Sequence, residues 1–167
     1  VGAGRIGTAF ANIMRGFGCR VLIFDPQVNP ELSSFASYLP LDQVLKESDF
    51  VSLHVPLTPE TRHLIDGRRM ALMKPNAILI NTGRGALVDT RALISALKAK
   101  LLGGACLDVY EEEDGVFYRD LSGLGIDDDT LARLLTFPNV LITAHQAFLT
   151  HEALRNIAAT TMANITH

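Results

Sequence analysis

Three residues that could bind an anion or move a proton come shortly after apolar runs in the sequence: Arg84, Asp108 and His145. A guanidinium grips a carboxylate through two parallel hydrogen bonds, and Gly83 and Gly85 keep the surroundings of Arg84 open. Histidine gives and takes protons near neutral pH. These residue types suit chemistry on a small carboxylate. The competing interpretations are a surface arginine and a histidine that only packs.

A glycine-rich motif opens the chain, with Gly2, Gly4 and Gly7 in the spacing GxGxxG. In nucleotide-binding loops the first glycine allows a tight turn and the second lets backbone N–H groups approach a pyrophosphate. The third lets the next helix pack closely. Asp25 ends the following apolar run, where a carboxylate accepts hydrogen bonds from ribose hydroxyls and repels a 2′-phosphate. The pattern predicts a site for NAD rather than NADP, with an ordinary glycine-rich turn as the alternative.

Short apolar runs alternate along the chain with segments that have helical periodicity. The strands and helices that they form must position the residues named above. Strands alternating with helices are typical of an α/β fold with a doubly wound parallel sheet, which is the fold class we predict. Ligands bind such sheets beyond the carboxyl ends of the strands. We predict strands at 20–24, 50–54, 77–81, 103–107 and 140–143, and helices at 7–18, 42–47, 67–73, 89–100 and 151–165.

In this fold Arg84, Asp108 and His145 would converge on one crevice that faces the glycine loop. A carboxylate-binding arginine, an acid–base histidine and a nucleotide site together indicate hydride transfer to a 2-oxo acid. His54 also ends a predicted strand, and we expect it to have a packing or supporting role.

The segment 110–129 interrupts the alternation and contains eight acidic residues. An irregular stretch of about 20 residues in a compact domain is usually functional or disordered. We interpret it as an acidic loop insertion and expect most of its carboxylates to be solvated.

The composition narrows the class of protein further. The chain has 167 residues, 48% hydrophobic and 20% charged, with a net charge of −3. It suits one domain, and without a basic excess neither nucleic acid nor an anionic membrane surface is an expected partner. No apolar run approaches the roughly 20 residues of a membrane span. Cys19 and Cys106 form no CxxC pattern, so we predict no metal site and a reducing compartment, the cytoplasm.

Both ends of the sequence predict a piece of a longer polypeptide. A single apolar residue precedes the glycine loop, so the first strand of the fold would be missing. The chain also ends within the helical pattern of 151–167, which we expect to lead out of the domain.

Five ordered motifs resemble the D-isomer-specific 2-hydroxyacid dehydrogenases: VGAGRIG, LHVPLTPET, NTGRGALVD, DVYEEE and TAHQAFLT. Within that family, the acidic run and the stretch around His145 look most like the fermentative D-lactate dehydrogenases. Relatives that act on glycerate or phosphoglycerate usually carry proline before the catalytic histidine, where this chain has Ala144.

The resemblance implies a catalytic set of Arg84, Glu113 and His145. Glu113 is selected because the family places its glutamate five residues beyond the residue that matches Asp108. Spacing alone could not choose among three consecutive glutamates, and a shift of one residue would name Glu112. Phe148 resembles an aromatic residue near the substrate. The implied cofactor-binding residues are Gly2, Gly4, Arg5, Ile6, Gly7, Asp25, Val55, Pro56, Thr82, Gly83 and Asp108.

The resemblance also implies a two-lobed subunit with the active site between the lobes, of which residues 1–167 form the NAD-binding lobe. Family members pair through this lobe, so a homodimer is expected. Reduction of pyruvate to D-lactate is the predicted reaction. The alternatives are glyoxylate, hydroxypyruvate or a bulkier 2-oxo acid as substrate, and a non-catalytic NAD-sensing module like the corepressors built on this fold.

Overall fold

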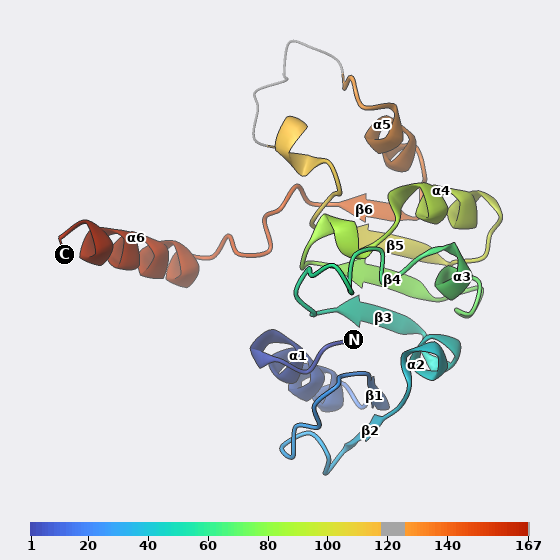
Figure 1. The fold of residues 1–167 in the computed structure, drawn as a ribbon, viewed down its shortest axis with the longest axis horizontal. Coiled ribbons are helices and arrows are strands. Elements are labelled where there is room, and N and C mark those ends of the chain that lie inside the picture. Colours follow the sequence, from blue (N-terminus) through green and yellow to red (C-terminus); the bar gives the residue numbers. More distant parts are fainter. Residues whose placement is uncertain (118–125, 167) are drawn as a thin grey trace.

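The computed structural model describes residues 1–117 and 126–166, which form an α/β fold with parallel strands (Figure 1). Two strands, β1 (Val21–Ile23) and β2 (Ala36–Tyr38), pair in one sheet. The second sheet has the order β3-β4-β5-β6, formed by Phe50–Leu53, Ile78–Asn81, Gly104–Leu107 and Val140–Ile142. The predicted fold class and all five predicted strands are confirmed.

Val1 and Gly2 lie between the two sheets and hydrogen-bond to both. The Gly2 N–H donates to the Phe24 carbonyl at 2.8 Å, at the end of β1, and the Val1 carbonyl accepts from the His54 N–H at 2.8 Å, at the end of β3. The Val1 nitrogen also donates to the Ser52 carbonyl at 2.9 Å. These bonds place the glycine loop beyond the carboxyl ends of β1 and β3.

The helices flank the strands. On the larger sheet, α2, α3, α4 and α5 pack against one another in a row, while α6 projects away from the body and has no buried residue (Figure 1). The core of this sheet includes the fully buried Leu53, Leu79 and Leu87. The helix bounds are α1 Arg5–Gly16, α2 Leu41–Glu47, α3 Gly67–Met70, α4 Thr90–Lys98, α5 Asp129–Leu135 and α6 His151–Ile165, and the 3-10 helices are η1 Gly85–Leu87 and η2 Glu113–Gly115. No helix in the described part of the chain is long and apolar enough to cross a membrane.

Strand β2, helix α5 and the two 3-10 helices were not predicted from the sequence. Strand β2 has only three residues, too few for an alternating pattern to stand out. Helix α5 begins inside the segment that we interpreted as an irregular loop, because Asp128 caps it by accepting from the Thr130 and Leu131 N–H groups. Leu131 and Leu134 are buried on its inner face.

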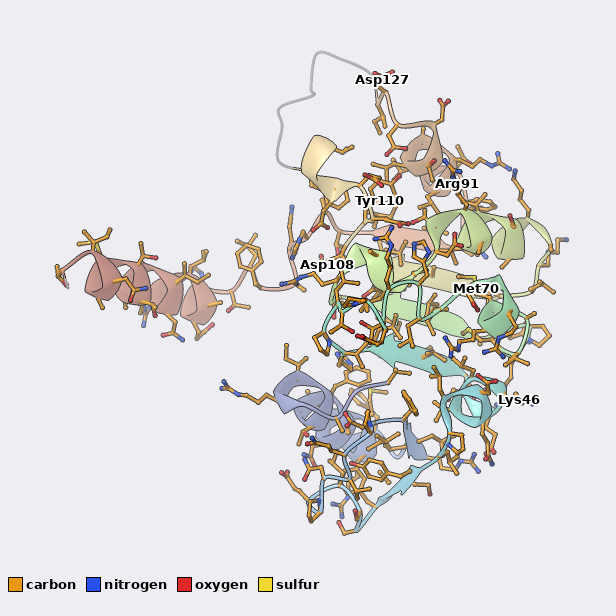
Figure 2. All side chains as sticks on the ribbon, viewed as in Figure 1. Lys46, Met70, Arg91, Asp108, Tyr110 and Asp127 are labelled. Atoms are coloured by element: carbon orange, nitrogen blue, oxygen red, sulfur yellow. The ribbon has the colours of Figure 1, made fainter. Side chains whose placement is uncertain are left out.

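The two ends of segment 110–129 are partly buried, and Glu111 and Glu113, with side-chain exposures of 15% and 16%, depart from the expectation that most carboxylates of this segment are solvated. Tyr110 is buried, and its hydroxyl donates to Asp128 Oδ2 at 2.7 Å. Burial and the neighbouring Asp128 carboxylate raise the pKa of Tyr110 well above its ordinary value, so the phenol stays a donor. Glu112 and Asp127 are exposed, as expected, and Figure 2 shows Asp127 at the outer edge of the molecule. Residues 118–125, with Asp120, lie outside the described residues, as does residue 167 of the predicted terminal helix.

Candidate active site

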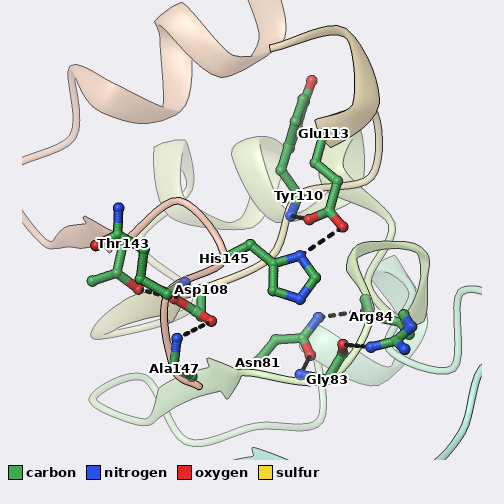
Figure 3. Close-up of polar contacts among 10 residues, drawn as sticks. Asn81, Gly83, Arg84, Asp108, Tyr110, Glu113, Thr143, His145 and Ala147 are labelled. Carbon is green, nitrogen blue, oxygen red and sulfur yellow. Dashed lines mark hydrogen bonds and ion pairs between the residues drawn. The ribbon is translucent and has the colours of Figure 1, made fainter. Parts of the chain in front are cut away.

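The carboxyl ends of β4, β5 and β6 bring the predicted catalytic residues together (Figure 3). Asn81 ends β4, and its buried side chain shapes the turn that follows. Its Nδ2 donates to the Arg84 carbonyl at 2.9 Å, and its Oδ1 accepts from the Gly83 N–H at 3.1 Å. The Asn81 amide thus sets the direction in which Arg84 leaves the sheet.

Arg84 is exposed at the edge of this turn. Its Nη1 donates to the Gly83 carbonyl at 2.7 Å, and no carboxylate among residues 1–117 and 126–166 forms an ion pair with it. A guanidinium whose charge is not matched by a carboxylate can bind an anionic ligand without breaking an existing pair.

His145 and Glu113 form a hydrogen-bonded pair. His145 Nδ1 lies 3.0 Å from Glu113 Oε1, and the other carboxylate oxygen, Oε2, accepts from the Tyr110 N–H at 3.1 Å. The side chains of both partners are largely buried, with exposures of 24% and 16%. Figure 3 shows the imidazole between Glu113 and the turn of Asn81 and Arg84. A carboxylate on Nδ1 orients the ring, so His145 is positioned to act as an acid–base group.

The loop that carries His145 has an unusual backbone. Ala144 and His145 both have positive φ angles, 51° and 55°, which cost energy in residues other than glycine. Asp108, buried at the end of β5, holds this loop by accepting from the N–H groups of Gln146 and Ala147, both at 2.8 Å. Its carboxylate also accepts from the Thr143 hydroxyl. In this structure Asp108 therefore supports the histidine loop, a role that the sequence did not predict.

The Asp108 carboxylate should stabilise the fold in a pH-dependent manner. Burial raises the pKa of Asp108, but hydrogen bonds from Thr143, Ala147 and Gln146 outweigh this effect and lower it below the ordinary value. The stabilisation is therefore complete above the unfolded-state pKa of about 3.9 and is lost as the pH falls through the lower folded-state pKa. We expect Asp108→Asn to lower the free energy of unfolding by about 1–3 kcal/mol at pH 7.

Denaturant unfolding of the full-length protein between pH 7 and pH 3 measures this effect. The difference between wild type and Asp108→Asn should shrink toward the acidic end, whereas the exposed control Asp127→Asn should show almost no difference at any pH. A constant difference would mean that the carboxylate charge does not contribute.

The glycine loop has a geometry suited to a bound pyrophosphate. Gly2 has φ 91°, and a Cβ added there would lie 2.7 Å from the His54 carbonyl carbon. At Gly4, by contrast, no atom lies within 4 Å of an added Cβ, so open space borders the loop. Gly4 precedes α1 without capping it by a side chain, which leaves the first N–H groups of the helix available to an anion. These features fit the predicted nucleotide site, with the pyrophosphate at the start of α1.

Asp25, which follows β1, accepts a hydrogen bond from the backbone of the glycine loop. Its Oδ2 accepts from the Ala3 N–H at 2.7 Å and its Oδ1 from the Gln27 N–H at 2.8 Å. A carboxylate oxygen has two acceptor sites, so these bonds leave capacity for ribose hydroxyls. The structure thus adds a second role for Asp25, which is to hold the glycine loop.

Most of the remaining predicted site residues are exposed. Val55 borders Gly2, with its Cγ1 2.9 Å from a Cβ added at that glycine. The exposed residues of the set are Arg5, Ile6, Pro56, Thr82 and Phe148. Ile6 is an apolar side chain left uncovered beside the loop. No group of three or more histidines, cysteines and acids in the described ranges could hold a metal ion.

His54 lies near the glycine loop but differs from His145. Its Nε2 is 2.9 Å from the Ser52 hydroxyl, and its ring packs against Phe10. Burial lowers the pKa of His54 to about 4. The ring is therefore neutral near pH 7 and is no proton donor, in line with the supporting role that we expected for it.

Comparison with known proteins finds a family model that matches most of this chain. Residues 1–147 match the model of the D-isomer specific 2-hydroxyacid dehydrogenase NAD-binding domain. The chain is 53% identical over 165 residues to 2-hydroxyacid dehydrogenase A of Aspergillus oryzae, covering 99% of this chain and 48% of that protein. It therefore spans about half the length of the curated relatives it matches.

Solved structures give the same result. A D-lactate dehydrogenase from Sporolactobacillus sp. superposes with a TM-score of 0.94 at 41% identity, covering 99% of this chain and 50% of that one. The NAD-complexed form of the D-isomer specific 2-hydroxyacid dehydrogenase from Lactobacillus delbrueckii ssp. bulgaricus gives 0.92 at 41% identity, with coverages of 98% and 50%.

Proposed function

Because the chain belongs to the D-isomer-specific 2-hydroxyacid dehydrogenases, as their NAD-binding domain, we propose that the full-length protein reduces a small 2-oxo acid with NADH, with pyruvate as the preferred substrate and D-lactate as product. The observation that carries the proposal is the Glu113–His145 pair, which faces the Arg84 turn at the edge that also holds the glycine loop. D-lactate dehydrogenases among the similar structures support pyruvate as the substrate.

In the proposed reaction, each of the three catalytic residues of this chain has its own role. Arg84 binds the substrate carboxylate and offsets the negative charge that develops on the carbonyl oxygen. His145 gives that oxygen its proton, and Glu113 keeps the imidazole oriented beforehand. When bound, NADH supplies the hydride that the carbonyl carbon accepts. The 2-oxo acid, NADH and one proton thus become the 2-hydroxy acid and NAD⁺.

The cofactor is held by the edge described above. Gly2, Gly4 and Gly7 with the start of α1 would receive the pyrophosphate, and Asp25 would receive the ribose hydroxyls. Val55, Pro56, Thr82 and Gly83 would line the path, with Arg5 and Ile6 beside the pyrophosphate. Asp108 would act near the nicotinamide by fixing the histidine loop. We further propose a homodimer in the cytoplasm, paired through this lobe.

A substrate panel tests this function. Oxidation of NADH by the full-length protein is followed with pyruvate, glyoxylate, hydroxypyruvate and phenylpyruvate, with NADPH as the cofactor control. We expect turnover to be greatest with pyruvate and NADH. Tight binding of NADH without turnover of any 2-oxo acid would contradict the enzyme and indicate an NAD-sensing module instead.

Arg84→Lys tests the proposed substrate contact. Lysine keeps the charge but loses the planar fork, so one charge-assisted hydrogen bond to the substrate is lost. At about 1.5–2 kcal/mol, this loss should lower kcat/KM about 10- to 30-fold, through both a higher KM and a lower kcat. Steady-state kinetics measure both constants, and Arg91→Lys on the exposed face of α4 is the matched control. Unchanged constants in Arg84→Lys would remove Arg84 from the site.

A further inference from the structure

His63 is a further histidine that contacts the active-site scaffold, and no sequence motif singles it out. It lies in the segment between β3 and α3 with φ 50°, a left-handed conformation that is rare for residues other than glycine. Its N–H donates to the Ala86 carbonyl at 2.7 Å. Ala86 belongs to η1, the turn that begins directly after Arg84, so the backbone of His63 holds the Arg84 turn.

The side chain of His63 reaches a different segment. Its Nε2 lies 2.6 Å from Glu111 Oε1, and Arg62 Nη2 donates to the same oxygen at 3.0 Å. The other oxygen, Oε2, accepts from the Thr90 hydroxyl at 3.2 Å, at the start of α4. Glu111 is thus a largely buried carboxylate with three donors, and it precedes Glu113 by two residues.

We propose that His63 and Glu111 are a positioning pair, which sets the distance between the Arg84 turn and the Glu113–His145 pair. The proposal rests on the function proposed above. His63 contacts the Arg84 turn through its backbone and the Glu113 segment through its ring, so it links the substrate-binding and proton-donating groups. The surface cavity that His63 and Glu111 line includes neither Arg84 nor His145, so the proposed role of the pair is to position those residues and not to bind the substrate.

The environment of the pair argues against an ordinary surface ion pair. Exposed pairs contribute little because solvent competes for both partners. Here the Glu111 side chain is 15% exposed, and its donors come from two separate parts of the chain. His63 is held in its left-handed conformation by bonds on both sides, since Ile65 continues the same pairing by donating to the Leu87 carbonyl at 3.0 Å.

The test compares His63→Ala, Glu111→Ala and the double variant in the full-length protein. We expect each single variant to lower kcat/KM about tenfold, with both a lower kcat and a higher KM, while the dissociation constant of NADH changes less than twofold. The double variant should be no worse than the poorer single variant within about twofold, because both changes break the same link. His63→Gln keeps an N–H donor and should recover part of the activity. The control Glu112→Ala, at an exposed neighbour, should match wild type.

A second readout does not depend on turnover. The nitrogen resonances of the His145 ring report its bond to Glu113, and we expect them to shift in Glu111→Ala but not in Glu112→Ala. Wild-type kinetics and unshifted resonances in Glu111→Ala, even with a lower Tm, would overturn the positioning pair. A wild-type protein that reduces no 2-oxo acid would instead overturn the proposed function, and the His145 resonances would still decide whether the pair positions this site.

Discussion

Glu113→Gln should lower kcat for 2-oxo acid reduction about 10²- to 10⁴-fold in the full-length protein, with NADH affinity within about twofold of wild type. The carboxylate accepts from His145 Nδ1 through one oxygen and from the Tyr110 N–H through the other. A glutamine amide offers one oxygen and one NH₂ group, so it can accept at only one of these positions. It also carries no charge, so the imidazole loses its charge-assisted hydrogen bond and its orientation together.

Steady-state kinetics across pH, with fluorescence titration of NADH, measure this effect. Glu112→Gln is the matched control, because Glu112 is the adjacent glutamate and is exposed. A loss of activity in Glu112→Gln with wild-type activity in Glu113→Gln would transfer the role to Glu112, the residue named by a shift of one position.

Gly85→Ala should lower kcat/KM about 10²-fold, although residue 85 itself performs no chemistry. A Cβ added at Gly85 would lie 2.1 Å from the carbonyl carbon and oxygen of Tyr110 and 2.5 Å from the Glu111 nitrogen. These atoms belong to the backbone, so the methyl group forces apart the Arg84 turn and the segment that carries Glu113. Displacements of about 1 Å in catalytic groups cost on the order of 10²-fold in rate.

Kinetics and thermal unfolding of the full-length variant separate a loss of catalytic activity from a loss of stability. We expect the loss of kcat/KM to persist at temperatures where circular dichroism shows the variant folded. Gly16→Ala at the end of α1 is the control, since no atom lies within 4 Å of a Cβ added there. Wild-type kinetics in folded Gly85→Ala would mean that the two segments can separate without harm to the site.

The parts of the site that could be predicted depend on local sequence patterns. The glycine loop, Asp25, Arg84 and His145 each follow an apolar run or open a helix, and topology alone places strand ends at one edge. Glu113 needed the resemblance, because three consecutive glutamates give no local signal. In the structure the Tyr110 N–H and His145 both contact Glu113, while Glu112 is exposed.

Other features depend on contacts that no local pattern encodes. The bond between His63 and Glu111 joins residues far apart in the chain, and Asn81 resembles any polar residue at a strand end. The sequence places Asp108 at the carboxyl end of a strand. Its hydrogen bonds with the Gln146 and Ala147 N–H groups, however, depend on the path of the loop after β6. Short elements such as β2 are stabilised by their partners, not by their own composition.

The left-handed conformation of Ala144 restricts which residues can precede the histidine in this loop. The proline ring fixes φ near −65°, so a proline at position 144 could not adopt the observed φ of 51°. A relative with proline before its histidine would therefore need a different backbone conformation at that position. Alanine and proline at this position thus differ in the backbone conformation that they allow. Exchanging the histidine motif between the two branches by design would require transplanting the whole loop with its anchor, Asp108, rather than a single side chain.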